Sequence, residues 1–189
     1  MTIPNGYAQV RAANGESNQL PAGGYVCQIL KAAPYTTKTG AEMFEISFDI
    51  ADGEHKDHFK KKYNEAKGTN PKVVWGGVYR VFLTSKDGLA SPFFKGLVTA
   101  IQDSNPRVPL IEGDTIHEEA MKGCLVGLLF RDEEFRGTDG AVRTTARPAM
   151  AVSVGRIMAG AYTIPKPRKL ADQAGKFVQV EVEDNDLPF

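Results

Sequence analysis

The stretch EMFEISFDI, from Glu42 to Ile50, decides the fold of this chain. Every second residue in it is a large apolar one: Phe44, Ile46, Phe48 and Ile50. Successive side chains of a β-strand point to opposite faces, so this alternation predicts a strand with one buried face. We therefore expect a sheet built around this strand.

Four further strands and one helix are predicted on either side of it. Residues 25–32 are apolar-rich, and the turn Asp52-Gly53 is typical of a short hairpin that leads into a strand at 55–63. Ser91-Pro92 is a typical helix start, and the helix is expected to end before Asn105. Residues 73–84 fit neither a helix nor a strand cleanly. The last two strands are predicted at 124–130 and 142–154. In the second of them, Val142, Thr144 and Ala146 are expected to face inward.

Three strands, a helix and two strands follow one another in an OB-fold, a five-stranded barrel. We therefore expect a mainly β protein with an OB-fold-like five-stranded barrel, a central helix and a disordered C-terminal tail. An open α+β sheet and a β-sandwich are the alternatives. The expected organisation is an irregular N-terminal segment (1–20), an OB-like domain (21–158), a basic Pro-rich linker (159–176) and an acidic tail (177–189).

Composition excludes several classes of protein. The 189 residues are 42% apolar, which is ordinary globular usage, and no stretch approaches the roughly 20 apolar residues of a membrane helix. The first residues lack the basic and apolar runs of a signal peptide. Cys27 and Cys124 each lie in an apolar run, which predicts buried reduced thiols. These features predict a cytoplasmic protein with no membrane partner.

The net charge of zero hides an uneven distribution of charge. Residues 55–80 contain seven Lys and Arg against two acids, and residues 141–170 contain six and no acid. Residues 177–189 contain four acids and no base. Basic segments favour a polyanionic partner, and the separate acidic segment indicates a different partner or competition for the basic surface.

Catalytic motifs are absent from the sequence, so we expect no enzyme activity and no cofactor. The acidic triplet 132–134 is the one alternative, as a divalent-metal site of a nuclease. Neighbouring strand residues point to opposite faces, however, so the three carboxylates would not converge without help. The other interpretation of the triplet is a solvated strand end.

Basic and aromatic residues together predict binding of single-stranded DNA. In the expected strand at 55–63, Lys56, Lys60 and Lys62 share one face and would follow a phosphate backbone. Nearby aromatic rings would stack on bases. Such stacking needs no particular DNA sequence, because every base has a flat face. For Tyr63 and Trp75 a place in the core is an equal alternative. The complete set of expected contacts is Tyr35, Lys56, Lys60, Lys62, Tyr63, Trp75, Tyr79, Arg80, Arg143, Arg147 and Arg156.

The last residues, Asn185-Asp186-Leu187-Pro188-Phe189, form an apolar tip behind an acidic run. A partner could hold the ring of Phe189 in a pocket and its carboxylate on a cation. This end resembles the acidic C-terminal tip of bacterial single-stranded DNA-binding proteins. The resemblance implies recruitment of replication or recombination enzymes, such as a helicase, polymerase, primase or recombination mediator. The residues that would bind them are Asp184, Asp186, Leu187, Pro188 and Phe189; an incidental acidic tail is the alternative.

The body of the chain carries a second resemblance, over residues 20–170. Phe93-Phe94-Lys95-Gly96, Asp103-Ser104-Asn105-Pro106, and residues 123–135 followed by Arg143, are similar to a family of phage and prophage proteins encoded among replication and recombination genes. The resemblance implies a role in phage replication or recombination, in the host cytoplasm. Together with the basic and aromatic residues and the acidic tip, it leads us to expect sequence-independent single-stranded DNA binding. The alternative is a recombination accessory protein without strong DNA binding. A homo-oligomer is compatible with the sequence, but the tetramer of the bacterial proteins is not implied.

Overall fold

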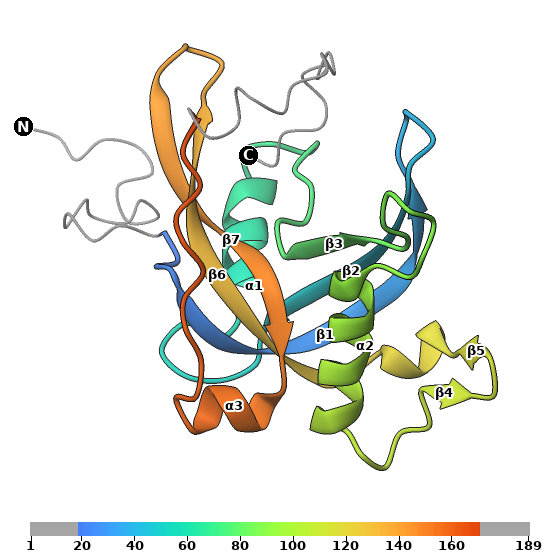
Figure 1. The fold of residues 1–189 in the computed structure, drawn as a ribbon. Coiled ribbons are helices and arrows are strands. Elements are labelled where there is room, and N and C mark those ends of the chain that lie inside the picture. The colour runs from blue at the N-terminus through green and yellow to red at the C-terminus, as the bar shows by residue number, and fades with distance from the viewer. Residues whose placement is uncertain (1–18, 171–189) are drawn as a thin grey trace, which may run out of the picture.

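The computed structural model describes residues 19–170, and this part of the chain is mainly β (Figure 1). A five-stranded antiparallel sheet has the order β3-β2-β1-β6-β7, and β4 and β5 form a separate hairpin. The strands are β1 (Gly23–Thr36), β2 (Glu42–Ile50), β3 (Val78–Phe82), β4 (Ile111–Glu112), β5 (Thr115–Ile116), β6 (Leu125–Arg136) and β7 (Val142–Val152). The helices are α1 (His58–Lys67), α2 (Pro92–Ser104), the 3-10 turn η1 (Glu118–Met121) and α3 (Val154–Met158).

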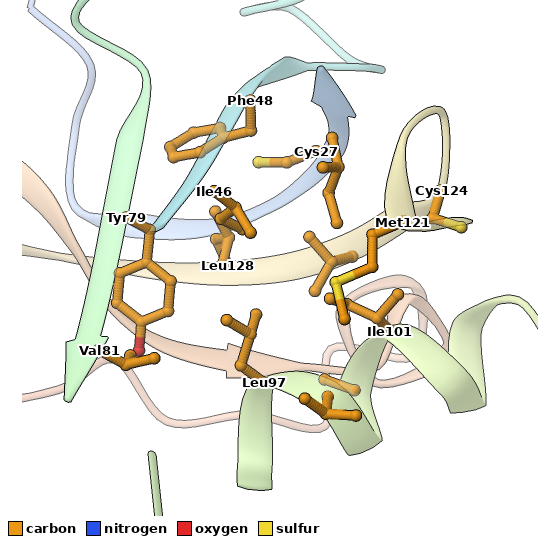
Figure 2. Packing of buried hydrophobic residues seen from close by; sticks show 14 of the residues in the cluster. Cys27, Ile46, Phe48, Tyr79, Val81, Leu97, Ile101, Met121, Cys124 and Leu128 are labelled. Atoms are coloured by element: carbon orange, nitrogen blue, oxygen red, sulfur yellow. The ribbon is translucent and has the colours of Figure 1, made fainter. Parts of the chain in front are cut away.

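The core forms where α2 covers one face of the sheet. The predicted strand Glu42–Ile50 is confirmed, and its alternate apolar side chains are all buried. The predicted helix is confirmed as α2, whose Leu97 and Ile101 pack against them (Figure 2). Cys27 and Cys124 are buried and unbonded to each other, as predicted, and burial raises the pKa of the Cys27 thiol far above its ordinary value.

The predicted OB-fold-like barrel is right in its five strands and in the place of the helix, but the five-stranded sheet does not close into a barrel. β3 and β7 are the two edges of the sheet, and no backbone ladder joins them. The hydroxyl of Tyr79 lies 3.5 Å from the carbonyl oxygen of Ala149, so a side chain of β3 reaches β7 where a backbone pair would close a barrel. β3 is also short, with five residues, which leaves little edge to pair.

The predicted strand at 55–63 is also wrong, because these residues enter α1. The buried carboxylate of Asp49 accepts the backbone N–H groups of Phe59 and Lys60, both at 3.0 Å, and so fixes the first turn of the helix from β2. Lys, Glu and Ala then favour a helix. The third strand is instead Val78–Phe82, within the segment whose pattern is ambiguous.

The hairpin of β6 and β7 extends beyond the rest of the sheet. β1 pairs with β6 only as far as Phe130, so residues 131–147, here called the arm, have no sheet neighbour on the β1 side. Val142, which the alternation predicts to face inward, is therefore 53% exposed. Figure 1 shows the arm and the β1–β2 hairpin rising as two separate projections of the sheet.

The segment Pro165–Leu170, here called the strap, follows the free edge of β6. Arg168 forms a parallel bridge with Glu133 of the arm. The boundaries proposed for the N-terminal segment, linker and tail remain predictions, and residues 171–189 lie outside the described residues. Between residues 19 and 170, no helix is both long enough and apolar enough to cross a membrane.

Candidate nucleic-acid interface

The outward face of β1, β2 and β3 carries a stacked cation and aromatic ring. The Arg80 guanidinium lies 4.5 Å from the centroid of the Tyr35 ring. Its Nε atom donates to the Glu45 carboxylate at 2.6 Å, across the directly paired strands β2 and β3. The carboxylate orients the guanidinium, and the ring supplies the flat surface beneath it. Two of the predicted site residues, from distant parts of the sequence, thus meet on one sheet face.

Phe82 belongs to the same face, although its apolar character suggests a core residue. In β3, Tyr79 and Val81 are buried, so the period of the strand turns Arg80 and Phe82 outward. Phe82 pairs with Met43 of β2, which in turn pairs with Tyr35 of β1. Its side chain is 54% exposed. An exposed aromatic ring in register with Tyr35 extends the surface available for stacking.

Lys56, Lys60 and Lys62 do not share one strand face, because they lie in α1 and the turn before it. All three side chains are exposed. Lys60 and Lys62 are two residues apart on a helix, which points them in different directions. The structure therefore gives a cationic helix end in place of the expected row of lysines.

Tyr63 and Trp75 pack against each other beside this helix. Their ring centroids are 5.8 Å apart, and the planes are tilted by 52°. The indole N–H of Trp75 donates to the carbonyl oxygens of Phe48, at 3.1 Å, and Gly77, at 3.2 Å. The Lys67 ammonium lies 5.8 Å from the Tyr63 ring. Both rings are half-buried, so each keeps part of its surface exposed.

Tyr79 does not join the expected aromatic surface. Its side chain is 5% exposed and points into the core (Figure 2). Burial raises the pKa of its hydroxyl to about 12. The residue fills the space between β3 and β7, where a base could not reach it.

The arm places Arg143 and Arg147 in different surroundings. Arg143 is paired with Asp139 at 2.6 Å, and its side chain is exposed. Arg147 is half-buried and lies directly opposite Arg131 in the β6–β7 register. Residues paired in this way share a face, and like charges placed opposite are unfavourable. Arg131 is paired with Glu133 at 2.8 Å, whereas within residues 19–170 the Arg147 guanidinium has no ion pair.

Arg156 lies apart from the other predicted contacts. It is on α3, at the end of the molecule away from both hairpin tips (Figure 1), and its Nε donates to the Ala161 carbonyl at 3.1 Å. The partner-binding residues predicted at 184–189 lie outside the described residues.

The acidic triplet at 132–134 does not gather around a common point. Glu133 is paired with Arg131, and the backbones of Asp132 and Glu134 are bonded to the strap. In the described part of the chain, no three His, Cys, Asp or Glu side chains are grouped so that they could hold a metal ion.

No protein-family model matches the chain, and no curated protein is significantly similar to it in sequence. The resemblances to bacterial single-stranded DNA-binding proteins and to phage and prophage proteins therefore depend on the short motifs. One of them, Asp103-Ser104-Asn105-Pro106, lies at the end of α2, where Asn105 bonds to the backbone of β6. That role is structural.

Proposed function

We propose that this protein binds single-stranded DNA without sequence preference during DNA replication or recombination. The observation that carries the proposal is the outward face of β1–β3, where Tyr35, Arg80 and Phe82 combine aromatic rings with a cation. Single-strand binders need rings on which bases stack and cations that follow the phosphates.

The arrangement of the sheet supports an OB-like assignment. An OB-fold binds oligonucleotides on the face of its second and third strands and between two of its hairpin loops, and such barrels are partly open. Here the corresponding face lies on β2 and β3, and the two hairpins are β1–β2 and β6–β7. We infer that the DNA strand crosses this face toward the arm. The expected contacts are Tyr35, Lys56, Lys60, Lys62, Tyr63, Trp75, Arg80, Phe82, Arg143 and Arg147.

The second half of the proposal concerns the acidic segment. Asp184, Asp186, Leu187, Pro188 and Phe189 would recruit a replication or recombination enzyme through an apolar tip next to negative charge. A recombination accessory protein that binds only proteins is the competing function. The acid-free basic segment 141–170 favours DNA binding, because a protein that binds only proteins has no need of it.

The deciding experiment compares a labelled single strand of about 35 nucleotides with the matching duplex, at low and high salt. We expect tight binding of the single strand alone, weakening with salt because phosphate contacts release counterions. Absence of binding to either would overturn the proposal and leave the accessory function.

A further inference from the structure

The strap is bonded to the edge of β6 like an additional short strand. The backbone N–H of Arg168 donates to the Asp132 carbonyl at 2.8 Å, and the N–H of Glu134 donates to the Arg168 carbonyl at 2.9 Å. The N–H of Leu170 donates to the Glu134 carboxylate at 3.2 Å. Figure 1 shows this segment, drawn in red, rising beside β6 toward the arm. A segment whose composition suggests a spacer is therefore attached to the sheet.

The strap changes the charge of the surface on which it lies. Residues 131–147 of the arm contain four basic and four acidic side chains, so the arm alone has no net charge. The strap adds Lys166, Arg168 and Lys169 and no acid. Lys166 and Lys169 are exposed, and Arg168 is half-buried. The arm with its strap thus carries a net charge of +3 from these sequence positions.

We propose that the strap makes the arm a binding surface for the phosphate backbone of single-stranded DNA. It adds three cations to an arm whose own basic and acidic side chains cancel, and its backbone bonds hold the segment that carries them in place. This inference rests on the function proposed above and adds a surface that the β1–β3 face does not include.

The competing explanation is that the strap only offsets the acidic triplet. Two contacts argue against it. Glu133 already has Arg131 as its partner, and Asp132 receives the strap through its backbone carbonyl. Among the described residues, no ion pair joins the carboxylate of Asp132 or Glu133 to the strap. Lys166 is exposed and, between residues 19 and 170, forms no ion pair, so its charge does not serve to offset the triplet.

The test measures binding of a fluorescent 35-nucleotide dT strand by the full chain over a series of salt concentrations. The variant is the double substitution Lys166→Ala and Lys169→Ala. Its control, Lys95→Ala with Lys122→Ala, removes two exposed lysines on α2 and beside η1. Each phosphate contact on a single strand contributes roughly 0.7 to the slope of log K against log salt, so losing two should reduce the slope by roughly 1.4.

A second pair of variants separates the attachment of the strap from its charge. Arg168→Ala and Arg168→Pro lose the same cation, but only the proline also loses the N–H that donates to Asp132. We expect Arg168→Pro to bind DNA more weakly than Arg168→Ala, with faster exchange of the Glu134 amide. Equal binding by the two would show that attachment is irrelevant and overturn that part of the inference.

The possible outcomes distinguish failure of the proposed function from failure of the strap inference. If the unmodified chain does not bind the strand, the proposed function fails, and this inference fails with it. If the unmodified chain binds and the strap variant has the same slope as the control, the strap inference alone is overturned.

Discussion

Asn105, just after α2, forms two hydrogen bonds with the backbone of Leu125 at the start of β6. Its Oδ1 accepts the Leu125 N–H at 3.0 Å, and its Nδ2 donates to the Leu125 carbonyl at 2.8 Å. The same amide also donates to the Ile101 carbonyl at 2.7 Å, within the last turn of α2. One side chain therefore closes the helix and joins it to the sheet.

We expect Asn105→Ala to lower the free energy of unfolding by about 1–3 kcal/mol, because partly buried backbone groups lose their partners. Asn105→Asp keeps an acceptor for the Leu125 N–H but has no donor, so it should also lower the free energy of unfolding measurably. Urea unfolding followed by circular dichroism measures both. Asn64→Ala, on an exposed position of α1, is the control and should change stability little. Equal stability of Asn105→Ala and the control would show that this junction is unimportant.

Gly77 lies where the Phe48 backbone, the Phe59 ring and the Trp75 indole meet. An added Cβ would overlap the Phe48 carbonyl oxygen and lie 2.9 Å from the Trp75 Nε1 atom. We expect Gly77→Ala to cost about 1–3 kcal/mol of stability. It should also shift the emission of Trp75, the single tryptophan, to longer wavelength as the ring is displaced.

The neighbouring glycine provides the matched control. A Cβ at Gly76 would meet only the Phe59 ring, at 3.5 Å, which is ordinary contact. Gly76→Ala should therefore keep both the stability and the emission of the unmodified chain. If Gly76→Ala and Gly77→Ala lose the same stability, the cause is the reduced flexibility of the backbone and not crowding around Gly77.

Local sequence pattern was sufficient for β2 and α2. Alternation determined which side of β2 is buried, and Ser91-Pro92 with Asn105-Pro106 marked both ends of α2. Residues 55–63 were misread because the residue that starts α1 is Asp49, in the preceding strand. No periodicity within the segment itself contains that contact.

The candidate site was predictable as a set of residue types but not as an arrangement. Tyr35 and Arg80 meet only because β1, β2 and β3 pair in one particular register. Phe82 was missed because an apolar residue in a strand suggests the core, whereas the burial of Tyr79 and Val81 fixes the opposite face for it. The attachment of the strap depends on backbone bonds, which leave no side-chain pattern in the sequence.

Tyr35 provides the most direct test of base stacking. Stacking of one base on an aromatic ring contributes about 1–3 kcal/mol, so Tyr35→Ala should weaken single-strand binding by roughly 5- to 150-fold. Tyr35→Phe keeps the ring and should bind nearly as well as the unmodified chain. Fluorescence anisotropy with a dT strand measures both affinities. If Tyr35→Phe and Tyr35→Ala lose affinity equally, the ring does not stack on bases.

His58, in the first turn of α1, should make stability depend on pH. Burial, with the nearby Lys62 ammonium, lowers the pKa of His58 below its ordinary value of 6.5. The unfolded chain then binds a proton at His58 more readily than the folded chain does. The contribution of neutral His58 to the free energy of unfolding is therefore complete above pH 6.5 and is lost as the pH falls. His58→Asn should reduce the decline in melting temperature between about pH 7 and pH 5.

Two lysine variants test the assigned cause of this pH dependence. Lys62→Gln removes a charge that disfavours protonated His58, so it should also make the decline smaller. Lys67→Gln removes a charge that lies over Tyr63 and should leave the decline unchanged. If the melting temperature declines as much in His58→Asn as in the unmodified chain, other titratable groups cause the decline.

Deletion of residues 177–189 should tighten single-strand binding at low salt. The deleted segment carries four acids and no base, and the rest of the chain has 23 basic and 19 acidic residues. An anionic segment attached to a cationic body competes with DNA for the same cations. Added salt screens this attraction, so the difference between the deleted and complete chains should shrink as salt is raised.

Charge and the apolar tip can be separated within this segment. Neutralising its acids should reproduce the effect of deletion on DNA affinity, whereas Phe189→Ala should leave that affinity unchanged and abolish capture of a partner enzyme that reads the tip. The acids to be replaced by their amides are Glu181, Glu183, Asp184 and Asp186. Unchanged affinity after deletion would exclude competition by the acidic segment while leaving single-strand binding itself intact, because the two depend on different residues.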